Sequence, residues 1–303
     1  RRVPTRVTVS SSSAASEGYK GQWEHIGWGR PDAVVSPRLK DIGPVGNSPV
    51  NELTVRFLDH VLKGQANGFA DGPRVDYFTM GENRWHSATS FPIAGTRYVT
   101  WYLGSEGRAN SSMGDGGLTT ARPHGAAADH FVYNPANPVP SLGGHSCCSW
   151  TSGPQGQFDQ SAIEQRPDIL IYTSAPLAED TNVTGPITVD LFATTDARDT
   201  DFTAKLLDVG PDGRAINLNN GIIRAAYRES LSHPTPIVPG QVYEYHIKVW
   251  PTSNLFKAGI ASGWKFPPAI IRSLRPTPIP ERCLASPSAH WLPRRPFCMT
   301  AHI

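Results

Sequence analysis

The fold is decided by a run of apolar and β-branched residues, Thr203-Ala204-Lys205-Leu206-Leu207-Asp208-Val209, which is followed by a turn sequence, Pro211-Asp212-Gly213. Other short segments have the same strand-like character, and they lie at 74–78, 98–103, 169–172, 187–192 and 242–249. No long helical pattern lies between them. Many short strands separated by turns predict a mainly β chain built as a sandwich or jelly roll.

Composition excludes several classes of function. The chain has 303 residues, 39% of them hydrophobic, with 28 Gly, 28 Pro and a formal net charge of +2. This charge is spread without a basic run, so we expect no nucleic-acid partner and no anionic-membrane partner. No uninterrupted apolar stretch approaches the length of about 18 residues that a transmembrane helix needs, so we expect no membrane partner of that kind either. Both a bacterial cytoplasmic and a secreted location stay open.

The N-terminal part differs in pattern from the strand-rich part. Residues 1–20 are rich in Ser and Arg, and we expect a poorly ordered N-terminus there. Residues 21–30 are dense in Gly and aromatic residues, which favours an ordered loop. Apolar residues then recur at helical spacing, which predicts a helix over 49–63 that Ser48 caps and Gly64 ends. The domain boundary is expected near 65–72. The chain lacks an initiator Met, so we expect it to belong to a longer polypeptide.

Several segments, taken in order along the chain, form a recognisable set. The N-terminal ones are Gly21-Gln22-Trp23-Glu24-His25, Phe57-Leu58-Asp59-His60-Val61-Leu62-Lys63-Gly64 and 75–85. The later ones are 138–144, 170–174, Asp199-Thr200-Asp201-Phe202-Thr203-Ala204-Lys205-Leu206 and Trp250-Pro251-Thr252-Ser253-Asn254-Leu255-Phe256-Lys257-Ala258-Gly259. Together these segments resemble the CocE/NonD family of α/β-hydrolases, which includes cocaine esterase, glutaryl acylases and X-prolyl dipeptidyl peptidases.

The resemblance implies a C-terminal fragment of such a hydrolase. Residues 21–68 would be the last loop and helix of the α/β-hydrolase domain. Residues 69–259 would be a galactose-binding-like jelly-roll β-sandwich of the X-prolyl dipeptidyl peptidase C-terminal type. The N-terminal hydrolase portion would be a missing partner, and a homo-oligomer is left open.

His25 falls on the family's catalytic histidine, which takes the proton of a serine nucleophile and returns it to the leaving group. No G-x-S-x-G sequence occurs in the chain, and no Asp precedes His25. The expected function is therefore hydrolysis of an ester or amide by a Ser-Asp-His mechanism of which this chain carries only the His, so we predict that it is inactive alone. Gln22 replaces the Pro that is usual in the family. Trp23, Gly144 and His145 are candidate substrate-binding residues.

The alternative is a non-catalytic jelly-roll module that binds carbohydrate or protein. Three tryptophans, Trp101, Trp150 and Trp250, fit sugar stacking, but core packing is favoured for them. No cofactor and no metal ligand is expected. The four cysteines lack metal spacing, and the aspartates at 199, 201 and 208 lack a Ca²⁺-loop pattern and are expected in caps and turns.

The tail after Gly259 departs from the family. Residues 260–303 contain eight Pro, no Asp and only Glu281 as an acidic residue. Dropping one base from codons for the family's next strand, His-Arg-Ile-Arg-Leu-Glu-Ile-Ser-Ser-Ser-Asn, yields Ile260-Ala261-Ser262-Gly263-Trp264-Lys265-Phe266-Pro267-Pro268-Ala269. We hypothesise that 260–303 is an irregular, frameshifted tail, and we expect it not to complete the sandwich because Pro cannot donate to a central ladder.

Overall fold

The computed structural model describes Val45, residues 49–73, 75–122, 127–145 and 156–259, and the backbone of 261–266 and 300–302. This part of the chain is mainly β, with one α-helix, α3 (Val50–Lys63), and two short 3-10 turns, η2 (Ile163–Gln165) and η3 (Ala225–Tyr227). The strands are β1 (Val75–Thr79), β2 (Arg84–Ala88), β3 (Thr100–Gly104), β4 (Gly117–Thr119), β5 (Leu170–Ser174), β6 (Thr181–Gly185), β7 (Thr188–Ala193), β8 (Asp201–Val209), β9 (Ala215–Arg224), β10 (Tyr243–Lys248), β11 (Thr252–Phe256), β12 (Ala261–Phe266) and β13 (Thr300–His302). In the described residues no helix has the length and apolar character that crossing a bilayer requires.

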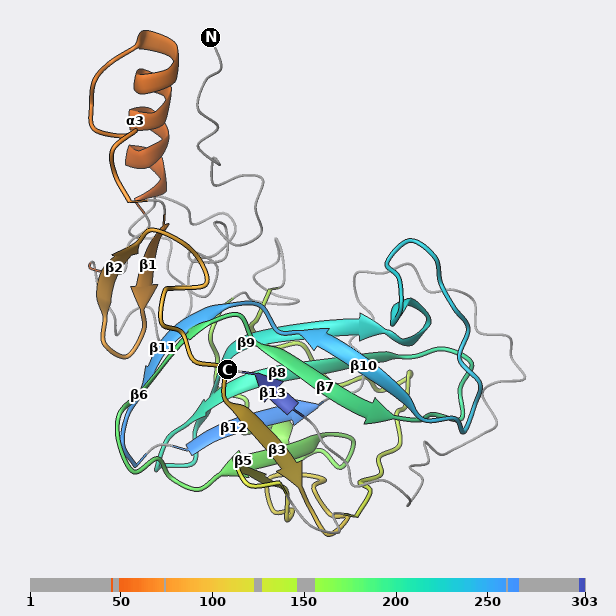
Figure 1. Ribbon diagram of the computed structural model, residues 1–303. Helices are drawn as coiled ribbons and strands as arrows, with labels where there is room; N and C mark the ends of the chain where they lie inside the picture. The colour runs from red at the N-terminus through yellow and green to blue at the C-terminus, as the bar shows by residue number, and fades with distance from the viewer. Residues whose placement is uncertain are drawn as a thin grey trace.

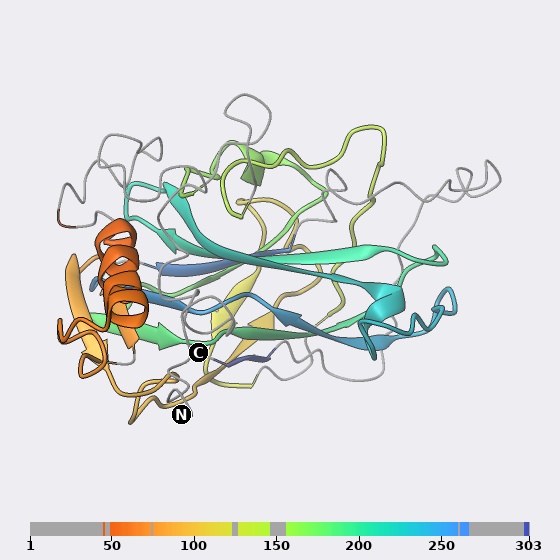
Figure 2. The ribbon, with the colours of Figure 1, turned by 90° about the horizontal axis from the view of Figure 1, so that it is seen from above.

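One large sheet folds over on itself. Its nine strands follow the order β10-β7-β13-β3-β4-β5-β12-β8-β9, while β1-β2 and β11-β6 form two small sheets. The two ends of the large sheet face each other, because the Phe202 ring of β8 lies 4.7 Å from the Tyr245 ring of β10. In Figure 2 the β8–β9 hairpin and the β7–β10 pair lie in separate layers. Gly221 of β9 lies so close to the Lys248 carbonyl of β10 that a Cβ would clash with it, so this contact requires glycine.

The core lies between these layers. Strand β8 is buried at every residue except Val209, which is half-buried. This differs from the simple alternation of a half-exposed strand, because both faces of β8 are covered. Phe202 packs toward β10, whereas Lys205 on the same strand donates to Gln160 of a covering loop, with Nζ 3.1 Å from Oε1.

Helix α3 stands apart from this core, at one end of the molecule beside the β1–β2 hairpin (Figure 1). It begins one residue later than predicted, with Pro49 at the N-cap position, and it ends as predicted at Gly64, which has a φ of 66°. The Phe57 ring contacts the Phe69 ring at a centroid distance of 5.5 Å. None of the 14 helix residues is buried, and an apolar stripe of Val55, Leu58, Val61 and Leu62 is exposed.

The prediction that 260–303 is irregular and does not complete the sandwich is wrong for two segments. Strand β12 pairs with both β5 and β8, and β13 pairs with both β3 and β7. The physical reason is that 261–266 precede the first Pro of the tail, so every backbone N–H is present. Ladder bonds join backbone groups, and a segment without Pro can fill a gap between two strands whatever its side chains. Residues 267–299 lie outside the described part, and the frameshift itself stays a hypothesis.

Candidate functional site

Two of the predicted site residues lie in the described part of the chain. His25 and Trp23 lie outside it, as do Trp150 and all four cysteines. Gly144 has a φ of 81°, and it exchanges two backbone hydrogen bonds with Gly156, at 2.7 and 3.1 Å. These two bonds hold Gly144 and Gly156 side by side.

Strand β9 fixes the position of His145. The Oδ1 atom of Asn220 accepts a hydrogen bond from the His145 backbone N–H at 3.2 Å. A Cβ on Gly144 would lie 2.5 Å from the same oxygen. Glycine at 144 is therefore needed both for its positive φ and for the close approach of Asn220.

An exposed tryptophan lies beside His145. The Trp250 ring meets the His145 ring edge-on, with centroids 5.9 Å apart and an interplanar angle of 64°. Trp250 is 38% exposed and has a φ of 70°, so core packing is a wrong prediction for it, whereas Trp101 does pack against the core. Asn219 of β9 holds the backbone of this turn by donating to the Pro251 carbonyl at 2.8 Å. Such a φ in a bulky residue is kept only where the surroundings fix it.

Buried polar side chains hold the backbone of Leu142, Gly156 and Phe158. Asn217 of β9 accepts from the Phe158 N–H at 2.7 Å and donates to the Gly156 carbonyl at 3.0 Å. Gln160 donates to the Leu142 carbonyl at 2.9 Å. Asn217 and Gln160 are each 1% exposed. The amides of β9 thus hold His145, Gly156 and the Trp250 turn in place, so that the His145 imidazole lies beside the exposed Trp250 indole.

The aspartates near β8 have structural partners. Asp199 accepts hydrogen bonds from the N–H groups of Thr200 and Ala226, both at 3.0 Å. Asp201 forms an ion pair with Arg224 at 2.9 Å. The expected turn role is confirmed for Asp199, and neither residue belongs to a group of possible metal ligands within the described part.

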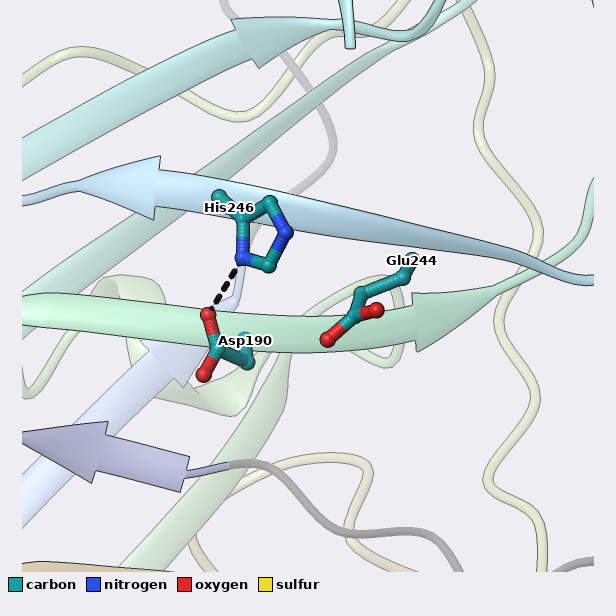
Figure 3. Close-up of side chains that lie close together, drawn as sticks. All are labelled: Asp190, Glu244 and His246. Atoms are coloured by element: carbon teal, nitrogen blue, oxygen red, sulfur yellow. Dashed lines mark hydrogen bonds and ion pairs between the residues drawn. The ribbon is translucent and has the colours of Figure 1, made fainter. Parts of the chain in front are cut away.

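A second cluster, which the sequence did not reveal, lies on the outer face of β7 and β10. It consists of Asp190, Glu244 and His246, whose possible ligand atoms all lie within 4.8 Å of one another (Figure 3). The His246 imidazole is hydrogen-bonded to Asp190, with Nδ1 2.7 Å from Oδ1. Glu244 and His246 are two residues apart on β10, so the sequence could have indicated that their side chains share one face of the strand. Only the pairing register places Asp190 opposite His246.

The described part of the chain is a mainly β domain with one α-helix. Residues 67–260 match the model of the X-Pro dipeptidyl-peptidase C-terminal non-catalytic domain, and the chain belongs to this family. It is 42% identical over 223 residues to cocaine esterase of Rhodococcus sp. (strain MB1 Bresler), an alignment that covers 73% of this chain and 38% of that protein.

Two solved structures share the fold. One is an aminopeptidase from the marine sediment archaeon Thaumarchaeota archaeon, with a TM-score of 0.67 and 25% identity over 84% of this chain and 44% of that one. The other is an α-amino acid ester hydrolase, with a TM-score of 0.65 and 23% identity over 86% of this chain and 45% of that one. The chain therefore spans roughly two fifths of the length of these proteins.

Proposed function

We propose that this chain is the C-terminal portion of a serine hydrolase that cleaves ester or amide bonds. The observation that carries the proposal is the 42% identity to cocaine esterase over 223 residues. The family description of a non-catalytic C-terminal domain fits a chain in which no G-x-S-x-G sequence occurs. The nucleophile and the acid would then belong to an upstream hydrolase portion, and the substrate would be a small ester or amide.

In this proposal the chain has two working parts. Residues 21–68 complete the α/β-hydrolase domain, and 69–259 form a galactose-binding-like jelly roll. The exposed stripe of α3 supports the first assignment, because a helix that leaves Val55, Leu58, Val61 and Leu62 exposed needs another surface to cover it. The facing ends of the nine-stranded sheet support the second.

His25 would be the general base and acid. A serine hydroxyl attacks a carbonyl only when a neighbouring base removes its proton, and the same imidazolium then protonates the leaving group. Trp23 and the Gly144–His145 loop would line the substrate pocket. The loop is suited to this role because Asn220 and Gly156 fix its base while Trp250 offers an exposed ring beside it.

The test is reconstitution with an activated aryl ester. The purified chain alone is expected to give no turnover that a serine-directed inhibitor blocks. Joined to the upstream hydrolase portion, it should give such turnover, and His25→Ala should lower the activity at least about a thousandfold. His233→Ala, in an exposed loop, is the matched control and should leave activity unchanged. Inhibitor-sensitive turnover by the chain alone, or full activity of His25→Ala, would contradict the proposal.

A second candidate is a module that binds carbohydrate without catalysis. The exposed Trp250 ring favours it, because aromatic faces stack on sugar rings. Glycan-array binding that Trp250→Ala abolishes, with no activity on adding the upstream portion, would favour this function over hydrolysis.

A further inference from the structure

The outer face of β7 and β10 carries a group of ligand-type side chains apart from the loop site. His246 stands directly opposite Asp190 in the antiparallel register, and Glu244 precedes His246 by two residues on the same face. Glu244 is therefore the diagonal neighbour of Asp190, a separation that a long side chain spans. Figure 3 shows the three side chains gathered over the two strands.

The possible ligand atoms of the Asp190 and Glu244 carboxylates lie within 4.8 Å of each other, and like charges at such short range repel each other. Within the described residues the Glu244 carboxylate forms no ion pair with a Lys or Arg. Lys248 lies on the same face, two residues beyond His246, but it too forms no ion pair in that part of the chain. A cation between the carboxylates would relieve the repulsion.

We propose that Asp190, Glu244 and His246 bind a divalent first-row transition metal, with Zn²⁺ as the representative ion. One imidazole nitrogen and two carboxylate oxygens are ligands that Zn²⁺ accepts, each at about 2.0–2.2 Å. Ligand atoms of a tetrahedral site then lie about 3.3–3.6 Å apart, so the present spacing of up to 4.8 Å must close by about 1 Å through side-chain rotation when the metal binds. On metal binding the Nδ1–H group of His246 no longer donates to Asp190: the Nδ1 proton is released to solvent, Nε2 carries the ring proton, and the Nδ1 lone pair faces the metal.

The site is accessible and its scaffold is ordered. The His246 side chain is 61% exposed, so an ion reaches it from solvent, and water completes the coordination. The three ligands come from two strands that pair over six residues. Because β10 is the edge strand of the large sheet, the bound metal links it to its neighbour β7. Metal binding should therefore raise the unfolding temperature of the chain.

The test is titration of the untagged chain with Zn²⁺ followed by calorimetry, together with Co²⁺ absorption spectra that report coordination. Glu244→Gln and His246→Gln should each weaken Zn²⁺ binding at least about tenfold and remove the Zn²⁺-dependent rise in unfolding temperature. Within the described part the Glu244 side chain, which lies on the exposed face of β10, forms no ion pair, so Glu244→Gln should leave the metal-free fold intact.

The matched controls are His233→Gln, an exposed histidine in the β9–β10 connection, and Lys248→Gln on the same face as the site. Both should bind Zn²⁺ at least as tightly as the unaltered chain. Equal binding by the unaltered chain, Glu244→Gln and His246→Gln would overturn the proposal, as would the absence of any Zn²⁺ binding.

Discussion

The sandwich buries its large apolar residues, whereas helix α3 leaves several of its own exposed. In the sandwich, Leu206 and Tyr245 are 1% and 0% exposed, whereas on α3 Leu58 and Leu62 are 42% and 75% exposed. Both regions have the periodic pattern that their secondary structure requires, so the sequence pattern alone does not separate them. The difference teaches that the sandwich supplies its own core, while α3 leaves an apolar stripe exposed, which we propose the upstream hydrolase portion covers.

The largest expected effect is a difference in the free energy of unfolding between truncating a leucine of the sandwich core and truncating a leucine of helix α3. Leu206→Ala should lower the free energy of unfolding by about 2–5 kcal/mol, because it leaves a cavity in a filled core. Leu62→Ala, the same change on α3, should alter it by no more than about 0.5 kcal/mol. Denaturant titration of both variants measures this difference, and equal losses would show that α3 is already packed.

A smaller effect concerns a buried hydrogen bond of the sandwich. The Tyr172 hydroxyl donates to Asp129, with 2.7 Å between the oxygens, and Tyr172→Phe should cost about 1–3 kcal/mol. Burial, and then the Asp129 carboxylate, raises the pKa of Tyr172 well above its usual value. Its contribution is therefore complete below about pH 10, the unfolded value, and is lost as pH rises further.

The free energy of unfolding, measured between pH 8 and 12, tests whether this stability is lost as pH rises. Tyr172→Phe should show a shallower loss of stability above pH 10 than the unaltered chain. Some loss should remain, because burial also raises the pKa of Tyr245 to about 12. An unchanged slope would contradict the role assigned to Tyr172.

The next effect is local and tests the loop site. Asn220→Ala removes the acceptor of the His145 N–H and should cost about 1 kcal/mol. The His145 amide should exchange with solvent faster, and the Trp250 fluorescence should change because its edge-on contact with His145 loosens. Unchanged exchange at His145 would show that Gly144 and Gly156 alone fix the loop.

The smallest effect is expected at Tyr245. Its hydroxyl is buried and has no hydrogen-bond partner within the described residues. Tyr245→Phe should therefore leave stability unchanged or raise it by up to about 1 kcal/mol. A thermal-unfolding curve decides this, and a clear loss would reveal a partner for the hydroxyl.

The strands that the sequence predicted share one property. Each is rich in apolar and β-branched residues, as 203–209 and 242–249 are, and the structure confirms strands at those places. Strand β9 was missed because Asn217, Asn219 and Asn220 have low β propensity. These amides are in the strand because they bond to loops far away in the sequence, such as the loop that begins at His145, and a local pattern does not contain those partners.

The candidate sites show the same limit. Gly144 and His145 were identified from their place in a family-like segment, and the structure adds their contacts with Asn220 and Trp250. The group around His246 was missed, because it depends on the pairing of β7 with β10 and not on any spacing along the chain. The prediction of an irregular tail was wrong for a related reason. Strand β12 pairs with β5 and β8 through backbone groups, which the amino-acid composition of the tail does not describe.

The most direct test is the affinity of this chain for the separately produced upstream hydrolase portion. The account predicts a measurable complex that Leu62→Asp on α3 weakens at least about tenfold, because a carboxylate would be buried in the contact. Leu231→Asp is the control, since Leu231 is 89% exposed on a loop of the sandwich, and it should leave the affinity unchanged. Equal affinities of the two variants, or no complex with the unaltered chain, would contradict the account.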